Sequence, residues 1–320
     1  MSQRTGRLRL PTGNQRREWF AAYAFLTPQL LGLVVFIGIP LAASIYYTFT
    51  KWDLIAPEPT WIGLRNWEYL LFEDPRVGKV LLNTVKFILT GTTSFLVLSL
   101  LVALLLSRKA KGNFVFRALF VLPWVLSSVA LGTTWKWLLN TRSGPLTQAV
   151  ELFGIKSPDW LLDPQWAMIA IAMATTWQAL GYGMTVYLAG LQGISDELYD
   201  AAKVDGANGW HRFRYVTFPM LSPTTFFLTV TSLIAAFQLY DAVVTMTSGG
   251  VAVAPGGPKD STRTIVLYLY NQMFQYSERM SGLGYAATIA WMLAILIFIV
   301  TIIQWRLGRL WVFYGGDDGR

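Results

Sequence analysis

The sequence alternates long apolar stretches with shorter polar ones. Six stretches each approach the roughly 20 residues that an α-helix needs to cross the hydrocarbon core of a bilayer. These stretches cover residues 22–47, 81–106, 116–138, 167–191, 219–240 and 283–305. The pattern predicts an all-α, polytopic membrane protein with six transmembrane helices. Pro28, Pro40 and Pro123 lie inside these stretches and are expected to kink their helices, as fixed bundle geometry or as hinges.

The composition agrees with a membrane protein surrounded by lipid. Of the 320 residues, 54% are hydrophobic and 14% are charged, whereas about 25% of the residues of a soluble domain are charged. The net charge of +8 comes from basic residues dispersed between the apolar stretches. A nucleic-acid surface would gather them on one soluble domain, so we expect no nucleic-acid partner.

The positions of lysine and arginine predict the orientation in the membrane. Basic residues are concentrated before the first stretch, between the second and the third, and after the last: Arg4, Arg7, Arg9, Arg16 and Arg17; Arg108, Lys109, Lys111 and Arg117; Arg306 and Arg309. Because cytoplasmic loops carry the excess of basic residues, both termini are predicted to be cytoplasmic. The first stretch is too long for a signal peptide and has no small-residue cleavage site. We therefore predict cytoplasmic tails at 1–20 and 309–320 around a transmembrane domain at 21–308.

The inventory of reactive side chains excludes several kinds of site. The chain has no cysteine and one histidine, His211, so it cannot build thiolate metal sites, cysteine nucleophiles or histidine metal clusters. It contains no G-x-x-x-x-G-K-[ST] motif and therefore encodes no P-loop nucleotide site. We predict a chain without catalytic residues, metal or cofactor of its own, and not an enzyme.

One polar segment, residues 195–219, has the signals of an ordered element. Ser195 can cap a short helix, and Gly206 can take the left-handed conformation that ends it. A second helical piece is expected from about Trp210 to Pro219, where the fifth stretch begins. The loop charges place this segment in the cytoplasm. A short capped helix with small side chains fits a groove on a partner protein, whereas its early acids disfavour the alternative of a helix lying on anionic lipid.

The sequence of this segment resembles a known family. E-L-Y-D-A-A-K-V-D-G-A at 197–207, with Pro219 twelve residues later, is similar to the EAA loop of ATP-binding-cassette (ABC) importer permeases. The chain departs from that pattern at Asp200, where the family has glutamate, and at Phe218, where it has leucine. Residues 47–50, 62–67, 116–124 and 247–250 resemble the carbohydrate-uptake subfamily, on the maltose and glycerol-3-phosphate side.

This resemblance implies the type I ABC importer permease fold in a bacterial or archaeal plasma (inner) membrane. It also implies that residues 192–218 form the coupling loop, which rests on a cytoplasmic ATPase dimer that binds ATP and Mg²⁺. The other implied partners are a homologous second permease subunit and an extracytoplasmic solute-binding protein. The residues expected to couple to the ATPase are Glu197, Asp200, Ala201, Ala202, Asp205, Gly206 and Pro219.

Polar stripes on two stretches are candidates for the substrate pathway. In the fourth stretch the stripe is Thr175, Gln178, Tyr182 and Thr185, and in the fifth it is Thr231, Gln238, Asp241 and Thr245, with Ser232 and Tyr240 beside it. Aromatic faces with amide and hydroxyl groups suit sugar binding, although such residues also bond helix to helix. Resemblance to the maltose-type permease implies a midplane site with Tyr182 and Ser232 at matching positions. The predicted pathway residues are Gln178, Tyr182, Ser232, Gln238, Tyr240 and Asp241.

The predicted function is that of the transmembrane subunit of an ATP-driven importer for a sugar or sugar derivative. One alternative is a related permease for another polar solute, such as glycerol-3-phosphate. A secondary transporter would require mid-span carboxylates or paired broken helices, and a membrane enzyme would require clustered catalytic groups. The apolar stretches hold almost no acid, which disfavours both.

Overall fold

The computed structural model describes residues 13–53, 56–108, 111–248, 255–274 and 282–313, and the side chains from residue 17 onward. Within these ranges the chain is almost entirely helical, as the hydropathy pattern predicts. The exception is a short antiparallel pair formed by β1 (Thr50–Lys51) and β2 (Thr60–Trp61), in which Thr50 pairs with Trp61.

The helices follow one another along the chain with short connections. The first half contains α1 (Gly13–Leu33), the π-helix η1 (Val34–Gly38), α2 (Ile39–Tyr47), α3 (Arg65–Glu68), the π-helix η2 (Tyr69–Glu73), α4 (Val77–Phe87), the π-helix η3 (Ile88–Thr92), α5 (Thr93–Ser107), α6 (Asn113–Val121), the 3₁₀-helix η4 (Leu122–Val125), α7 (Ser128–Leu138) and α8 (Pro145–Leu152). The second half contains α9 (Ala167–Gln192), α10 (Asp196–Val204), α11 (Gly209–Arg212), the π-helix η5 (Phe213–Thr217), α12 (Phe218–Met220), α13 (Ser222–Phe237), α14 (Asp241–Thr247), the 3₁₀-helix η6 (Pro258–Asp260), α15 (Ile265–Phe274) and α16 (Leu283–Trp311).

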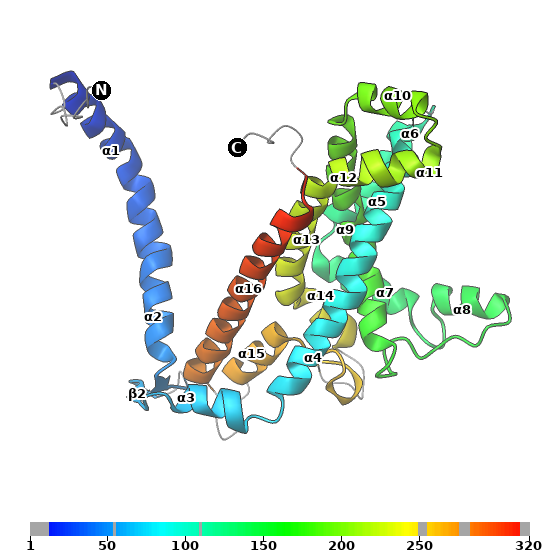
Figure 1. Ribbon diagram of the computed structural model, residues 1–320. Coiled ribbons are helices and arrows are strands. Elements are labelled where there is room, and N and C mark those ends of the chain that lie inside the picture. The colour runs from blue at the N-terminus through cyan, green and yellow to red at the C-terminus, as the bar shows by residue number, and fades with distance from the viewer. Residues whose placement is uncertain (1–12, 54–55, 109–110, 249–254, 275–281, 314–320) are drawn as a thin grey trace.

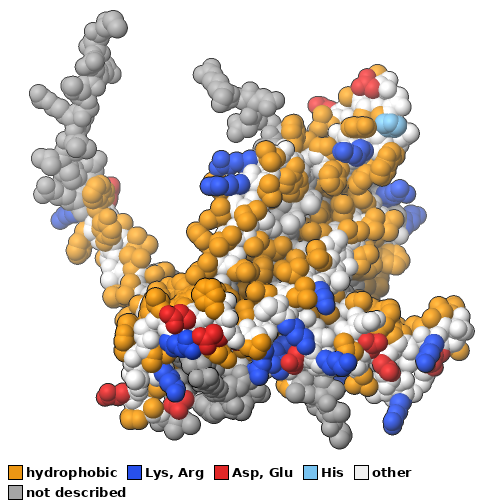
Figure 2. All heavy atoms as spheres, turned by 60° about the horizontal axis from the view of Figure 1, so that its bottom comes forward, with side chains coloured by type: hydrophobic (Ala, Val, Ile, Leu, Met, Phe, Trp, Pro, Cys, Tyr) orange, Lys and Arg blue, Asp and Glu red, His pale blue; other side chains and the backbone are white. Residues whose placement is uncertain are grey.

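These helices form an elongated bundle with two distinct ends (Figure 1). The α10 end carries α10 and α11, the start of α1 and the last turns of α16, whereas the α3 end carries α3, the β pair and the start of α4. Figure 2 looks onto the α3 end and shows charged side chains of both signs there, with a mainly hydrophobic flank rising toward the α10 end. The start of α1, the last turns of α16 and the predicted coupling segment therefore share one end.

The first helix stands apart from the bundle (Figure 1). It runs without interruption through α1, η1 and α2, and none of its most apolar 18-residue window is buried. It joins the rest near its α3 end, where the Trp291 indole N–H donates to the Ser44 hydroxyl at 3.1 Å. The helix continues through both of its prolines. The π-turn η1 directly before Pro40 changes the bonding pattern, so the missing proline N–H does not break the helix.

Two predicted spans are bent rather than straight. The third breaks after Pro123, and the two pieces, Asn113–Val125 and Ser128–Leu138, meet at 102°. The fifth bends by 61° between Gly209–Met220 and Ser222–Phe237, and α13 ends at Phe237 rather than Tyr240. By length and composition, the described residues contain three helices able to cross a membrane, or five if each bent pair counts as one span.

Helix α9 occupies the centre of the bundle. It is 26 residues long but is not among the helices apolar enough to qualify by composition, because glycine and polar residues interrupt its apolar ones. Packing explains this composition: α9 contacts α5, α6, α7, α13 and α14, so protein rather than lipid surrounds much of it. Gly181 allows α6 to come close, since a Cβ there would lie 2.2 Å from the Phe120 carbonyl oxygen.

Candidate functional site

A cavity of about 340 Å³ lies beside α9. Five elements wall it: the α4–η3–α5 helix, η4, α9, α13 and the residues that follow α13. Its lining residues are Phe87, Gly91, Thr92, Phe95, Trp124, Thr175, Thr176, Gln178, Ala179, Tyr182, Thr231, Ser232, Ala235, Ala236 and Leu239. Most of the wall is apolar, and the polar groups come mainly from the facing sides of α9 and α13.

Two aromatic rings form a flat surface in this cavity. The rings of Trp124 and Tyr182 stack with centroids 5.5 Å apart and an interplanar angle of 18°. Trp124 comes from η4, where Pro123 replaces α-helical bonding by a tight 3₁₀ turn. The carbonyl of Leu126, freed by the end of that turn, accepts a hydrogen bond from Gln178 Nε2 at 2.9 Å. The break at Pro123 therefore places both Trp124 and the partner of Gln178.

The polar lining groups are neutral, and several retain free acceptor capacity. The hydroxyls of Thr175, Thr231 and Ser232 donate to carbonyls of their own helices, at 2.9, 2.9 and 3.2 Å. Each hydroxyl oxygen can still accept hydrogen bonds. The lining residues include no lysine, arginine, aspartate or glutamate. The cavity thus offers an aromatic face and neutral hydrogen-bonding groups. Among the described residues, no group of three or more histidines or acids could hold a metal ion.

The structure brings together three of the six predicted pathway residues. Gln178, Tyr182 and Ser232 line the cavity. Gln238 and Tyr240 lie between α13 and α14, where the fifth predicted span is broken, and Asp241 is the exposed first residue of α14. The stripe expected on a continuous fifth helix is therefore interrupted. A role for these last three residues in the pathway stays a prediction.

The predicted coupling segment folds as a capped helix at the α10 end. Ser195 is the N-cap of α10, and its hydroxyl accepts from the Glu197 N–H at 3.2 Å, as expected from the sequence. Gly206 has φ +76°, and the N–H of Ala207 donates to the Ala202 carbonyl at 2.9 Å. This pattern of a left-handed glycine and a bond back across the last turn ends helices efficiently. Local sequence thus fixes both ends of α10.

A second short helix, α11, attaches this segment to the bundle. The Asn208 side chain caps it by accepting from the His211 N–H at 2.9 Å. The hydroxyls of Tyr199, in α10, and Thr217, at the end of η5, form a hydrogen bond of 3.1 Å. Tyr199 also packs against Val216 at the edge of the buried cluster around Leu188 and Leu221. The segment is therefore fixed to the membrane helices rather than loosely attached.

The predicted coupling residues form the outer surface of this segment. Glu197, Asp200, Ala201, Asp205 and Gly206 are exposed, whereas Ala202 and Pro219 are half-buried. The Asp200 carboxylate forms an ion pair with Lys203 at 2.7 Å, and both side chains are more than half exposed. Next to them, Trp210 is 67% exposed. The surface combines acids, small side chains and a large aromatic residue.

Comparison with known proteins identifies the family of the chain. Residues 80–311 match the model of the family described as "Binding-protein-dependent transport system inner membrane component". The matched region covers the walls of the cavity and the whole of α10–α12. The chain belongs to this family. It is therefore a permease, the non-catalytic inner-membrane component of an ABC transporter.

Relatives of this permease span nearly its whole length. The probable ABC transporter permease protein YesP of Bacillus subtilis (strain 168) is 33% identical over 305 residues, which cover 95% of each chain. The lactose transport system permease protein LacF of Rhizobium radiobacter is 36% identical over 242 residues, covering 75% of this chain and 78% of LacF. A solved chain of a bacterial ABC transporter that imports the acidic polysaccharide alginate superposes with a TM-score of 0.74. It shows 21% identity and covers 92% of this chain and 97% of its own. The permease therefore has the ABC importer fold.

Sequence reasoning missed one side of the permease cavity. Phe87, Gly91 and Phe95 line it from the α4–η3–α5 helix, and Trp124 lines it from η4. A Phe-Gly-Phe row at four-residue spacing resembles ordinary packing, so periodicity alone does not single it out. The proline directly before Trp124 was an available signal, because a helix break inside an apolar stretch exposes the residues beside it.

Proposed function

We propose that this permease is one transmembrane subunit of an ATP-driven importer for a sugar or sugar derivative. In this proposal, an extracytoplasmic solute-binding protein delivers the substrate, and a separate cytoplasmic ATPase drives translocation. One observation carries the proposal. The two helices that supply the polar lining of the cavity, α9 and α13, are joined at one end by the exposed α10–α11 segment.

This connection provides a route from the ATPase to the cavity. At the base of the segment, Gly190 near the end of α9 packs against Thr224 and Leu221 at the start of α13. A Cβ at Gly190 would lie 2.6 Å from Thr224 Oγ1. Because these roots are in tight contact, a displacement of α10 is transmitted to α9 and α13 together. The ATPase would hold α10 in a cleft, with Glu197 and Asp200 near basic groups of that partner.

The chemistry of the lining favours a neutral sugar. An aromatic face with hydroxyl and amide groups matches the flat apolar side and the hydroxyls of a pyranose. Several relatives are sugar permeases by name, including the trehalose/maltose transport system permease protein MalF of Thermococcus litoralis, at 28% identity. The glycerol-3-phosphate permease protein UgpA of Agrobacterium fabrum is 30% identical. A phosphate group would find no cation among the lining residues here, so we infer a sugar.

We propose a six-span topology with both termini and α10 in the cytoplasm. The spans would be α1–α2, α4–α5, the bent α6–α7 pair, α9, α12–α13 and α16. Shared placement of the α10 segment and both terminal helix ends at one end of the bundle supports this arrangement (Figure 1). The basic loop residues then lie on the cytoplasmic side, and the α3 end faces outward.

A homologous second permease would cover the first helix. The side chains of α1 and α2 are exposed along nearly their whole length; Phe25 is 87% exposed and Phe36 is 80% exposed. Lipid alone could solvate these residues, but a helix that stands apart from its own bundle is suited to packing against another subunit. The cavity is also only partly enclosed by this chain, which fits a pathway formed between two permeases.

The test is reconstitution of the complex in lipid nanodiscs with its ATPase, second permease and solute-binding protein. We expect ATP hydrolysis to rise when the binding protein is loaded with a neutral mono- or oligosaccharide. Uptake of the same radiolabelled sugar into proteoliposomes should require ATP inside the assay on the α10 side. Stimulation by glycerol-3-phosphate and by no neutral sugar would overturn the sugar assignment. ATP-independent uptake driven by an ion gradient would overturn the whole proposal.

A further inference from the structure

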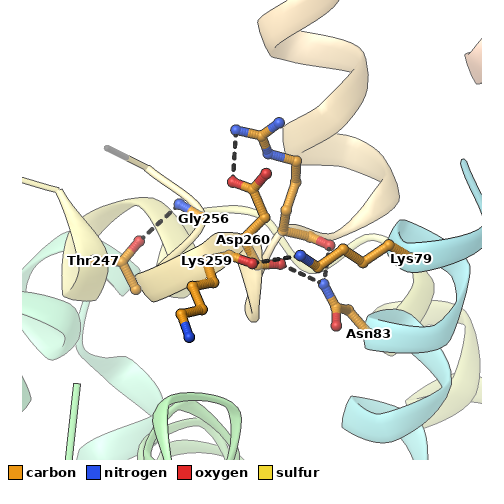
Figure 3. A network of polar contacts seen from close by, with 7 residues as sticks. Lys79, Asn83, Thr247, Gly256, Lys259 and Asp260 are labelled. Atoms are coloured by element: carbon orange, nitrogen blue, oxygen red, sulfur yellow. Dashed lines mark hydrogen bonds and ion pairs between the residues drawn. The ribbon is translucent and has the colours of Figure 1, made fainter. Parts of the chain in front are cut away.

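A loop at the α3 end is attached to the helix that walls the cavity. The loop, residues 255–264, precedes α15, and two side chains of α4 bind its backbone (Figure 3). Lys79 Nζ donates to the Lys259 carbonyl at 2.5 Å. Asn83 Nδ2 donates to the carbonyls of Asp260 and Arg263, at 2.7 and 3.1 Å. Asn83 is 2% exposed, so its amide uses both N–H groups on this loop inside a buried contact.

The backbone of this loop is held in an unfavourable conformation. Lys259 and Asp260 have φ angles of 51° and 59°, in the left-handed region that non-glycine residues seldom occupy. Such residues persist only when the surroundings hold them, and they gather at functional segments. The bonds from Lys79 and Asn83 end on the carbonyls of these strained residues. An ion pair of 2.9 Å between Asp260 and Arg263 adds a further constraint (Figure 3).

The same helix face continues from the loop to the cavity. Asn83, Phe87, Gly91 and Phe95 follow one another at four-residue spacing along α4, η3 and α5, so they form one row along the helix. The last three members of the row line the cavity. Asn83 is therefore the outer member of the row that forms one cavity wall.

The loop has a second connection to the cavity. The Thr264 hydroxyl donates to the Leu239 carbonyl at 2.7 Å, and Leu239 lines the cavity. On the preceding side, Gly256 N–H donates to Thr247 Oγ1 at 3.2 Å (Figure 3). The loop thus joins the α4 wall to the α13–α14 wall at the end opposite α10.

We propose that this loop is a contact surface for the solute-binding protein, and that Asn83, assisted by Lys79, transmits docking to the cavity wall. This inference rests on the proposed function, which places the α3 end outside the cell. Lys259 and Lys79 are exposed at the loop, so the docking surface of the binding protein is expected to carry carboxylates. Pressure on the loop then acts through the Asn83 amide on the row that ends at Phe95. Asn83 is a positioning residue and does not touch the substrate.

The chain supplies a matched control for this role. Asn66 is 1% exposed and donates through Nδ2 to two carbonyls, those of Thr48 and Thr50, both at 2.9 Å. It lies at the same end of the bundle but ties α3 to the base of the first helix. Asn83→Asp and Asn66→Asp each remove two N–H donors and place a carboxylate against two carbonyl oxygens. Their cost to folding is therefore similar, while their effect on the cavity differs.

The experiment compares basal and binding-protein-stimulated ATP hydrolysis of the complete complex in nanodiscs. We expect Asn83→Asp to lower the stimulation about tenfold, equivalent to about 1.4 kcal/mol of coupling, with basal hydrolysis unchanged. Asn66→Asp is expected to keep the stimulation. Lys79→Met, at an exposed position, is expected to lower it about threefold without a change in melting temperature.

Because the chain has no cysteine, a single reporter can follow the cavity directly. Ala235→Cys lies in the lining, and its labelling rate by a maleimide is expected to change on addition of binding protein. That change should disappear when Asn83→Asp is added and persist with Asn66→Asp. Retained stimulation in Asn83→Asp, or equal loss in both asparagine variants, would overturn the inference. A wild-type complex that no binding protein stimulates would instead overturn the proposed function.

Discussion

The turn at Gly206 allows a quantitative test of the coupling segment. This residue has φ +76°, and a Cβ built on it meets no atom within 4 Å. Gly206→Ala therefore adds no clash, and its cost comes from the backbone conformation alone. For an L-residue this left-handed conformation costs roughly 1–2 kcal/mol relative to the right-handed one. The variant is expected to loosen the end of α10 while leaving the membrane helices intact.

The same segment contains a control glycine. Gly209 also has open space around it, but its φ is not in the left-handed region. Gly209→Ala should therefore be nearly neutral. Gly206→Asn should fall between the two, since asparagine tolerates the left-handed region better than alanine does.

The measurement is ATPase association and sugar uptake by the reconstituted complex. A cost of 1–2 kcal/mol corresponds to a factor of about 5–30 in an equilibrium, so Gly206→Ala should weaken ATPase binding by about that factor. Uptake at limiting ATPase should fall with it, while the melting temperature of the isolated permease changes little. Equal ATPase affinity for Gly206→Ala and Gly209→Ala would refute the idea that the capped geometry of α10 is what the ATPase recognises.

Four further substitutions test the cavity, the coupling surface and the packing. Tyr182→Ala removes one ring of the aromatic pair and should lower sugar-dependent uptake about 3–10-fold at low substrate; an equal fall in basal ATP hydrolysis would point to packing instead. Asp200→Lys should reduce co-purification of the ATPase about tenfold or more without altering membrane insertion, and equal recovery would refute the proposed ion pair. Ser195→Ala should cost the α10 cap about 1 kcal/mol, seen as faster amide exchange in α10 alone. Gly181→Ala, whose Cβ would lie 2.2 Å from a backbone oxygen of α6, should lower the melting temperature, whereas Gly32→Ala, with open space, should not.

Local features of the structure followed readily from the sequence. The helical content, the cap at Ser195 and the left-handed turn at Gly206 each depend on residues within one or two turns of each other. The α9 stripe was predictable for the same reason, because Gln178 and Tyr182 belong to one continuous helix. Short-range rules of spacing and capping are sufficient for such elements.

Features that depend on distant segments were not predictable in the same way. The apolar stretch at 116–138 gives no sign that its two pieces meet at 102°, since hydropathy counts residues and not direction. The fifth stretch stops being helical at Gln238, where tertiary packing around the Leu239 carbonyl replaces helical bonding. Central placement of α9 also reverses the usual expectation, because a span surrounded by protein tolerates polar residues that lipid would not.

The π-turn at Ile88–Thr92 divides the helix that runs from Val77 to Ser107 into two parts of separate angular phase. A π-turn holds one residue more than an α-turn, and one residue corresponds to about 100° of rotation around an α-helix. The outer part presents Asn83 to the loop, and the inner part presents Phe95 to the cavity. Evolution could therefore rotate one face against the other by inserting or deleting a single residue at this turn. In related chains, a one-residue gap at this position would mark a change in helix phase rather than in span length.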